Sequence, residues 1–228
     1  MPDLAQTDQI SQYVERLRAL DCCGVSDAMD KLGLSGVVSN IPQASGTARI
    51  AGRVVTFKVG PGDPLPGPPR HLGTTAVELA GRDDVIVVEQ SSGVEAGCWG
   101  GLLTMGAKTR GVAGVIADGP VRDIDEARAY GFSVFTNRLT ARTARGRVVE
   151  LGVQCPVSIS GTSVSPGDYV IADASAVIFI AADQIKAVID AAEVIVAREA
   201  AMAKAIAEGT PISQVMGGAY EHMLTEPK

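Results

Sequence analysis

Hydrophobic positions in the first part of the chain recur at the spacing of helices. Between residues 10 and 20 apolar side chains return every three or four positions, which predicts an amphipathic helix. A second, shorter helix is predicted from Val25 to Gly33. We expect Ser26 to be its N-cap, because a serine oxygen accepts hydrogen bonds from first-turn amides. Gly33 is the expected C-terminal stop.

The pattern then changes to that of strands. The residues from Thr47 to Val59 are strand-like, and Gly60–Arg70, with five prolines and three glycines, predicts a stiff surface loop. A helix is predicted over His71–Ala80. Asp83–Gln90 is a short apolar run with polar flanks, which is typical of a strand buried on both faces.

The second half of the chain contains short strands and then helices. Gly131–Thr136 predicts another strand, and Val148–Ala181 is divided by Gly, Pro and Ser into short runs that predict antiparallel hairpins. Ala182–Glu208 predicts one long helix that ends at Gly209. Thr210-Pro211 predicts a short further helix, with Thr210 as cap and proline at the first helical position.

Composition limits the class of protein. With 228 residues and 46% hydrophobic content, the chain can bury the core of one α/β domain with appended helices. The net charge is −6 without a basic block, which argues against direct nucleic-acid binding. No apolar run approaches the roughly 20 residues of a membrane-spanning helix. The polar N-terminus shows no signal-peptide pattern, and the four cysteines lack zinc or disulfide spacing, so we expect a cytoplasmic protein.

The stretch from residue 95 to 126 carries the candidate chemistry. It predicts a loop, a helix that begins at Gly100-Gly101, a buried strand at Gly114–Ala117, and a turn with Arg122-Asp123. This order brings a helix N-terminus and the carboxyl end of a strand to one edge of a sheet. Anions bind at such edges, because unpaired N–H groups and the helix dipole favour negative charge. The stretch therefore predicts a carboxylate site.

The helix start has two possible explanations. Gly100 and Gly101 let the backbone approach a ligand, and the amides of Leu102 and Leu103 point out of the helix. Close packing of the helix on the sheet would explain the same pair of glycines.

Arg122 and Asp123 also allow two interpretations. The guanidinium fork of Arg122 matches a carboxylate, and Asp123 is a hard oxygen ligand. One carboxylate, several waters and substrate oxygens are a common way to hold Mg²⁺. Such a metal would stabilise the enolate formed when a 2-oxo acid loses a C–C bond. The alternative is that both residues form ordinary surface pairs at the start of an acidic helix.

Two features outside this stretch remain open. His71 begins a predicted helix at the edge of the proline loop, so it lies either near the site or at an ordinary cap. Arg138, Arg142, Arg145 and Arg147 fall within ten residues. Such a cluster in an acidic protein either guides a multiply charged anion or forms solvated surface and inter-subunit salt bridges.

Three segments carry a family resemblance: SDAMDKLG, GGLLTMGAKTRGVAGVIADGPVRDIDE and PVSISGTSVSPGDYVIADASAVIFI. They resemble the RraA-like family, which includes the regulators of ribonuclease E activity and the divalent-metal-dependent 4-hydroxy-4-methyl-2-oxoglutarate aldolases. The likeness spans about residues 25–208, which implies a core there within a single domain over 1–228 and a helical tail over 209–228. It also implies the swivelling β/β/α fold and a homotrimer or homohexamer with sites between subunits.

The resemblance implies roles for particular residues. The amides of Gly100–Leu103 and the side chain of Arg122 would bind the pyruvyl part of the substrate. Asp123 would ligate Mg²⁺, Mn²⁺ or another divalent metal. The aldolases also use a glutamate from the C-terminal helix of a neighbouring subunit, and Glu199 matches its place.

One departure from the family concerns proton transfer. In the aldolases an acidic residue is followed by twenty residues and then Arg-Asp, and this chain has Gly101 at that acidic position. The ribonuclease regulators instead resemble a variant with a degraded Arg-Asp pair, which this chain keeps. Glu95, His71 and Glu126 are the candidates to replace the missing acid. Arg70–Gly73 and Thr143–Arg147 resemble features of a subgroup with its own substrate.

These observations predict a metal-dependent lyase. It would cleave C–C bonds of a 2-oxo polycarboxylic acid, by retro-aldol cleavage or by decarboxylation of oxaloacetate. The alternatives are a non-catalytic regulator that binds an RNA-degrading enzyme, and a related lyase for a different acid.

Overall fold

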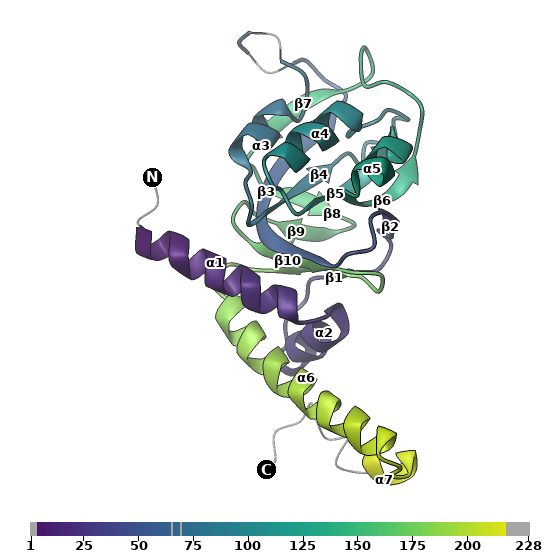
Figure 1. Cartoon of the computed structure of the whole chain (residues 1–228). Helices are drawn as coiled ribbons and strands as arrows, with labels where there is room; N and C mark the ends of the chain where they lie inside the picture. Colours follow the sequence, from purple (N-terminus) through teal and green to yellow (C-terminus); the bar gives the residue numbers. More distant parts are fainter. Residues whose placement is uncertain (1–3, 65, 69, 218–228) are drawn as a thin grey trace.

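The computed structural model describes residues 4–64, 66–68 and 70–217, so the predicted tail is described only to its ninth residue. A nine-stranded sheet runs in the order β1-β11-β10-β3-β4-β5-β6-β2, with β7 also paired to β3, and β8 and β9 form a separate hairpin (Figure 1). The strands are β1 Val37–Val38, β2 Gln43–Ser45, β3 Ile50–Gly60, β4 Asp84–Glu89, β5 Gly114–Val121, β6 Ser133–Leu139, β7 Val149–Val153, β8 Val157–Ile159, β9 Thr162–Val164, β10 Tyr169–Ala172 and β11 Val177–Ile180. The helices are α1 Leu4–Ala19, α2 Cys22–Lys31, α3 Thr74–Leu79, α4 Gly101–Thr109, α5 Ile124–Tyr130, α6 Ile185–Ala207 and α7 Ile212–Val215.

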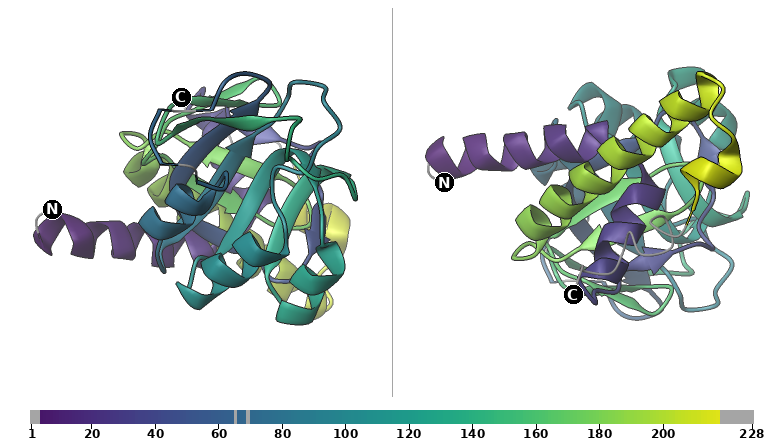
Figure 2. Two further views of the ribbon diagram at one scale, coloured as in Figure 1. Left: turned by 90° about the horizontal axis from the view of Figure 1, so that it is seen from above. Right: turned by 90° about the horizontal axis from the view of Figure 1, so that it is seen from below.

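The centre of the sheet is parallel. Strands β3, β4, β5 and β6 pair in parallel in chain order, and each crossover contains one of the helices α3, α4 and α5. All three helices lie on one face of the sheet (Figures 1 and 2), as right-handed crossovers between successive strands require. The carboxyl ends of these strands therefore meet at one edge, together with the N-termini of α4 and α5.

Strand β4 is buried on both faces, as its apolar run predicts. Ile86 and Val88 pack toward the three crossover helices, while Val85 and Val87 pack into the core on the other face of the sheet. All four are fully buried. Burying one such side chain is worth roughly 1.5–3 kcal/mol, so this strand anchors both layers.

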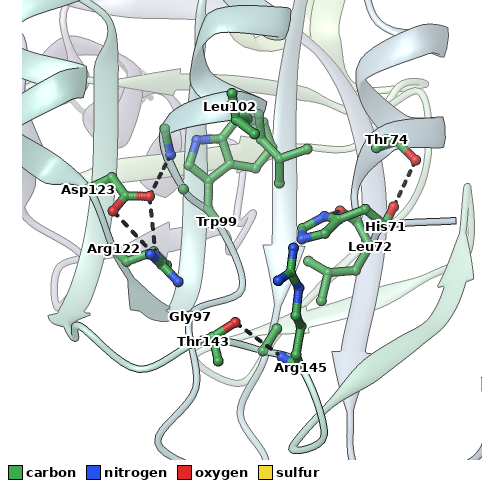
Figure 3. A pocket seen from close by; sticks show the side chains of 14 residues that line it. His71, Leu72, Thr74, Gly97, Trp99, Leu102, Arg122, Asp123, Thr143 and Arg145 are labelled. Carbon is green, nitrogen blue, oxygen red and sulfur yellow. Dashed lines mark hydrogen bonds and ion pairs between the residues drawn. The ribbon is translucent and has the colours of Figure 1, made fainter.

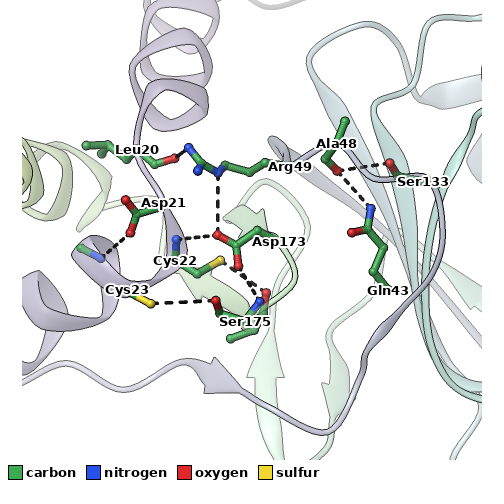
Figure 4. Close-up of polar contacts among 12 residues, drawn as sticks. Leu20, Asp21, Cys22, Cys23, Gln43, Ala48, Arg49, Ser133, Asp173 and Ser175 are labelled. Carbon is green, nitrogen blue, oxygen red and sulfur yellow. Dashed lines mark hydrogen bonds and ion pairs between the residues drawn. The ribbon is translucent and has the colours of Figure 1, made fainter.

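The terminal helices form a separate layer. Helices α1, α2 and α6 pack together and against β10 and β11 (Figure 2), with Val188, Ile189 and Ala192 of α6 in this core. Figure 4 shows how α2 is attached: Asp173, after β10, accepts a hydrogen bond from the amide of Cys22 at 3.0 Å. Arg49 pairs with the same carboxylate at 3.7 Å. The expected α/β architecture with N-terminal helices and a long C-terminal helix is confirmed.

Several predicted boundaries are wrong in detail. Helix α2 starts at Cys22, and its N-cap is Asp21, whose Oδ1 accepts from the amide of Gly24 at 2.8 Å. Ser26 is therefore inside the helix and does not cap it, because the aspartate offers the same acceptor one turn earlier. Gly33, with φ of 68°, follows the helix as a stop, as predicted.

Other differences come from long-range pairing. Hairpins β8–β9 and β10–β11 are antiparallel as predicted, but β7 pairs with the second half of β3 instead of a neighbour in sequence. Helix α3 begins at Thr74, three residues after His71, and β5 continues to Val121. Pro211 is the N-cap of α7, so neither Thr210 nor Pro211 has its expected position.

Candidate active site

The candidate site lies where β5 ends beside the start of α4. Residues 98–100 run alongside the end of β5: the amide of Cys98 donates to the carbonyl of Pro120 at 2.8 Å, and Trp99 forms a parallel bridge with Val121. The amide of Arg122 then donates to the carbonyl of Trp99 at 3.0 Å. Backbone pairing therefore brings the N-terminus of α4 to the Arg122-Asp123 turn, as the order of elements predicts.

Asp123 joins the two helix starts. It occupies the N-cap position of α5 but makes no side-chain cap there, and its Oδ2 accepts instead from the amide of Gly101 at 3.0 Å. Its φ is 58°, in the left-handed region, which costs on the order of 1–3 kcal/mol for a residue with a side chain. The backbone conformation thus turns the carboxylate of Asp123 toward α4, whose own N-cap is a glycine.

The Arg122 side chain contacts the protein through its methylene groups, which lie against Gly97 and Gly100, and through Nε. Its Nε lies 3.3 and 3.2 Å from the two carboxylate oxygens of Asp123. Within the described ranges, its two terminal nitrogens bind no protein oxygen. The side chain is 37% exposed, so the outer edge of the fork is available to an anion.

The glycines before α4 make room for Arg122 and Asp123. A Cβ atom at Gly97 would lie 3.1 Å from Cγ and Cδ of Arg122. A Cβ atom at Gly100 would lie 2.9 Å from Oδ2 of Asp123 and 3.1 Å from Cγ of Arg122. Gly100 therefore serves the packing of the two functional side chains, an explanation that the sequence did not provide.

Glu126 fills the space in front of Gly101. A Cβ atom at Gly101 would collide with the Glu126 carboxylate, coming to 2.8 Å from Cδ and still closer to Oε2. Glu126 is the third residue of α5, from where a glutamate often reaches back to the N-cap amide, but it makes no such bond here. The carboxylate missing from position 101 thus has a spatial counterpart on the next helix.

A cavity of about 540 Å³ opens beside this arrangement (Figure 3). One wall carries Arg122, Asp123 and the start of α4. The opposite wall carries His71 and Arg145. The lining residues are His71, Leu72, Thr74, Gly97, Trp99, Gly100, Gly101, Leu102, Leu103, Arg122, Asp123, Thr143, Ala144 and Arg145.

The first turn of α4 supplies backbone donors to the cavity. In the part of the chain that the structure describes, the amides of Leu102 and Leu103 have no hydrogen-bond acceptor. The Leu102 side chain is 92% exposed, whereas Leu103 is buried against the core. The expected donors therefore line the cavity.

Trp99 is a site residue that the sequence reasoning did not identify. It is buried, it lines the cavity, and its Nε1 donates to Oγ1 of Thr104 at 2.8 Å. This bond ties the loop before α4 to the first turn of the helix. The only available signal was the position of the single tryptophan directly before Gly100-Gly101.

Two of the predicted catalytic residues lie elsewhere. Glu95 is outside the cavity lining, and it pairs with Arg142 at 3.4 Å and accepts from Thr140 at 3.3 Å. Glu199 lies on α6, in the helical layer that also contains α2 (Figure 1). Burial, together with the negative charges of Asp27 and Asp21, raises the pKa of Glu199.

Cys98 is an unsuitable nucleophile. Its side chain is fully buried, and its Sγ donates to the carbonyl of Pro120 at 3.3 Å. Burial raises the pKa of this thiol to about 12. Since the thiolate is the reactive form, Cys98 is a structural residue behind the Arg122 wall.

The donor set fits magnesium better than zinc. No group of three or more His, Cys, Asp or Glu side chains able to hold a metal occurs among the described residues. Asp123 lines the cavity, and Glu126, which is not a lining residue, lies against the lining residue Gly101. One or two carboxylates supplemented by water and substrate oxygens suit Mg²⁺ or Mn²⁺, whereas a zinc site needs three or four protein ligands.

The comparisons with known proteins agree with this architecture. The family model described as RraA-like, Aldolase/RraA, matches residues 22–179. The chain is 28% identical to a protein of Halalkalibacterium halodurans named "Putative 4-hydroxy-4-methyl-2-oxoglutarate aldolase", over 90% of this chain and 91% of that protein. It is 27% identical to protein DlpA of Legionella pneumophila over 93% of this chain, but it spans only 34% of that longer protein.

Two solved structures share the fold. An uncharacterized protein from Pseudomonas syringae superposes with a TM-score of 0.81 at 24% identity, over 91% of this chain and 98% of that one. The RNA-processing inhibitor RraA from Thermus thermophilis superposes with a TM-score of 0.57 at 26% identity, over 68% of this chain and 91% of that one. None of the helices in the described residues is long and apolar enough to cross a membrane.

Proposed function

Because the chain belongs to the RraA-like, Aldolase/RraA family, we propose that it is a divalent-metal-dependent C–C lyase that acts on a 2-oxo polycarboxylic acid. Its reaction would be a retro-aldol cleavage of the 4-hydroxy-4-methyl-2-oxoglutarate type, a decarboxylation of oxaloacetate, or both. The observation that carries the proposal is the Asp123 carboxylate, which is bound to the first amide of α4 and to Arg122 on one wall of the cavity.

The 2-oxo acid end of the substrate would bind this wall. The terminal nitrogens of Arg122 donate to its carboxylate, and the amides of Leu102 and Leu103 donate to the same group. When bound by Asp123, Mg²⁺ or Mn²⁺ supplies Lewis-acid polarisation of the 2-oxo group. Arg122 and the helix N-terminus then stabilise the negative charge that develops on this half of the substrate as the bond breaks.

We assign the proton transfers to Glu126. In the retro-aldol direction, Oε2 accepts the proton of the C4 hydroxyl group, directly or through one water, as the C3–C4 bond breaks. The C3–C4 electron pair moves into the 2-oxo acid half, and the same proton is then returned to C3 to give pyruvate. Of the three candidates, Glu126 is supported because it stands beside Gly101, whereas Glu95 is paired outside the cavity and His71 lies on the opposite wall.

Glu199 fits this scheme only through a neighbouring subunit. In its own chain it belongs to the layer of α1, α2 and α6, not to the cavity lining. We therefore propose a homotrimer or homohexamer in which Glu199 serves the site of an adjacent copy. Sedimentation measurement of the particle mass tests this assembly, and a monomeric particle with full activity would refute it.

The substitution Asp123→Ala tests the reaction. We expect loss of pyruvate release from oxaloacetate and from 4-hydroxy-4-methyl-2-oxoglutarate by roughly 100-fold or more, since Lewis-acid polarisation is worth several kcal/mol. Calorimetric binding of Mn²⁺ should weaken in parallel, and EDTA should abolish the wild-type activity. Asp125→Ala is the matched control, because that side chain is two residues away, 93% exposed and paired only with Arg128. Equal rates for wild type and Asp123→Ala would refute the proposal.

The second candidate is a non-catalytic regulator that binds an RNA-degrading enzyme. The likeness to the RNA-processing inhibitor from Thermus supports it. Co-purification with such an enzyme, together with no metal-dependent turnover of any 2-oxo acid, would favour this candidate over the lyase.

A further inference from the structure

The wall opposite Arg122 is formed by two segments that lie far apart in sequence. His71 and Leu72 come from the end of the proline loop, and Thr143, Ala144 and Arg145 come from the loop between β6 and β7. In the sequence both segments resemble features of a subgroup with its own substrate, and His71 is also one of the candidates for the missing acid. The fold brings them together on one side of the cavity (Figure 3).

Arg145 is the cavity residue of the arginine cluster. In the described chain its guanidinium group makes no hydrogen bond or ion pair, and Figure 3 shows its side chain extending along the wall toward His71. Two other members are already occupied: Arg142 pairs with Glu95 at 3.4 Å, and Arg147 donates to the carbonyl of Thr143 at 3.1 Å. Neither of these two, nor Arg138, lines the cavity.

The loop that carries Arg145 is anchored. The amide of Arg145 donates to Oγ1 of Thr143 at 3.3 Å, and the amides of Arg147 and Val148 donate to the carbonyl of Ala144 at 2.9 and 3.1 Å. Ala144 is buried beneath this turn. A turn fixed in this way presents the guanidinium group to the cavity at a reduced entropic cost of binding.

His71 is oriented by the backbone of the next residue, Leu72. Its Nδ1 lies 2.9 Å from the carbonyl of Leu72, which can only accept, so Nδ1 carries a proton. Nε2 is left for another partner, and it donates to an anion when the ring carries its second proton, as an imidazolium. The carbonyl of His71 accepts from Oγ1 of Thr74 at 2.7 Å, and the amide of Gly73 donates to Glu150 at 2.7 Å. The histidine ring is thus held at the cavity by its own contact with Leu72 and by the bonds that fix the backbone after it.

The charges that line the cavity are unbalanced. Asp123 is paired with Arg122, whereas Arg145 faces no carboxylate among the lining residues. A bound divalent cation would increase the positive charge. A cavity of about 540 Å³ is also larger than a three-carbon acid needs, since pockets of roughly 300–1,000 Å³ hold drug-sized ligands.

We propose that Arg145 and His71 form a second anion subsite, which binds the carboxylate of the substrate that is remote from the reacting 2-oxo acid. The inference rests on the proposed function and deepens it, because it assigns the residues that bind the second carboxylate of a 2-oxo polycarboxylic acid that spans the cavity. Arg122 fixes the reacting end, and Arg145 selects acids with a charged far end.

The test compares two substrates that share the bond to be broken. 4-Hydroxy-4-methyl-2-oxoglutarate has the far carboxylate, and 4-hydroxy-4-methyl-2-oxopentanoate has a methyl group in its place. We expect kcat/KM of the wild type to favour the diacid. Arg145→Gln should reduce this preference by roughly 10- to 100-fold, chiefly through KM, as expected for a lost charge-assisted contact. Arg145→Lys should recover part of it, because charge returns without the fork.

Arg142→Gln is the matched control, since Arg142 lies in the same loop with its side chain paired outside the cavity. It should leave the preference unchanged. An equal loss on both substrates in Arg145→Gln would overturn the second subsite while the proposed lyase stands.

Calorimetry separates the subsite from catalysis. With Mn²⁺ present, 2-oxoglutarate should bind wild type more tightly than 2-oxopentanoate, and Arg145→Gln should lose that difference. This result would support the subsite even if neither hydroxy acid were cleaved, an outcome that would refute only the proposed retro-aldol reaction. Equal affinity of both acids for the wild type would overturn the subsite.

Discussion

The two walls of the cavity each carry an arginine, but they are built differently. Arg122 directly follows a buried strand, its amide is bonded to Trp99, and its Nε contacts the carboxylate that also receives the first amide of α4. Arg145 stands on a surface loop that is fixed by its own turn. Changing the first wall therefore disturbs strand, helix and carboxylate together, whereas the second wall can vary alone.

This difference in construction matches the different parts of the substrate that we assign to the two walls. The reacting 2-oxo acid group is common to the proposed substrates, so its contacts belong on the sheet edge, where backbone bonds fix their geometry. The far end of the acid varies between substrates, and loops can change there without disturbing the core. If the two walls differ in function as they do in construction, changes in the first wall affect all substrates alike, and changes in the second wall affect only the preference between them.

The largest effect is expected at Glu126, beside the first wall. Glu126→Gln preserves size and removes the proton acceptor, so kcat should fall by roughly 10²–10⁴. Binding of oxalate, which needs no proton transfer, should change little. Steady-state pyruvate release and calorimetry measure the two quantities. Asp125→Asn, one residue earlier and 93% exposed, is the control. An unchanged kcat in Glu126→Gln would remove Glu126 from the mechanism.

A double substitution sharpens this test. Gly101→Asp alone places a side chain against the Glu126 carboxylate and should be damaging. In the Glu126→Ala background the same change has room, and it returns a carboxylate to nearly the same position. Gly101→Asp should therefore impair the wild type but partly restore Glu126→Ala. The same sign of effect in both backgrounds would show that the two carboxylates do not share a position.

Those parts of the site that are formed by residues close together in the chain could be predicted from the sequence, and those formed by distant residues could not. The first wall comes from one stretch of strand, turn and helix, so the order of elements was enough to place Arg122-Asp123 beside Gly100-Gly101. The position of Glu126 was not readable, because it depends on the left-handed backbone of Asp123 that sets the direction of α5. The contact of the His71 and Arg145 segments depends on pairing between distant strands, including β7 with β3, and local periodicity carries no signal for that pairing.

A smaller effect is expected at Gly100, because the side chains of Arg122 and Asp123 occupy the space that a side chain at this position would need. In Gly100→Ala the new Cβ atom would stand 2.9 Å from Oδ2 of Asp123 and 3.1 Å from Cγ of Arg122. The backbone itself tolerates alanine, since φ is −162°. We expect roughly 10- to 100-fold weaker binding of diacids and monoacids alike, because the common end of the substrate loses its contacts.

Gly106→Ala is the control for Gly100→Ala. It lies in the interior of the same helix, where its Cβ would meet only Cγ1 of Val77 at 3.2 Å and where alanine favours the helix by about 1 kcal/mol. Calorimetry with 2-oxopentanoate and 2-oxoglutarate distinguishes the variants. A Gly100→Ala protein that loses only diacid binding would contradict the division between the walls.

The smallest effect is expected behind the first wall, at Cys98. Burial raises the pKa of its thiol to about 12, so the thiol form predominates strongly near neutral pH. Iodoacetamide should therefore label the exposed Cys23 while Cys98 stays unmodified, and labelling of Cys98 should rise with pH as the thiolate fraction rises. Mass spectrometry of the native protein measures both sites, and denatured protein serves as the reference for full labelling.

The substitution Cys98→Ala tests whether activity and stability depend on the thiol behind the Arg122 wall. The Sγ bond to the carbonyl of Pro120 is a weak one at 3.3 Å, and the amide of Cys98 already binds that carbonyl at 2.8 Å. Alanine keeps the backbone bond and leaves only a small void, so activity should stay within about twofold and stability should fall by about 1 kcal/mol. Rapid labelling of native Cys98, or a large loss of activity in Cys98→Ala, would show that the first wall opens. The Arg122 wall would then be no more rigid than the Arg145 wall, and the two walls could not be distinguished by their rigidity.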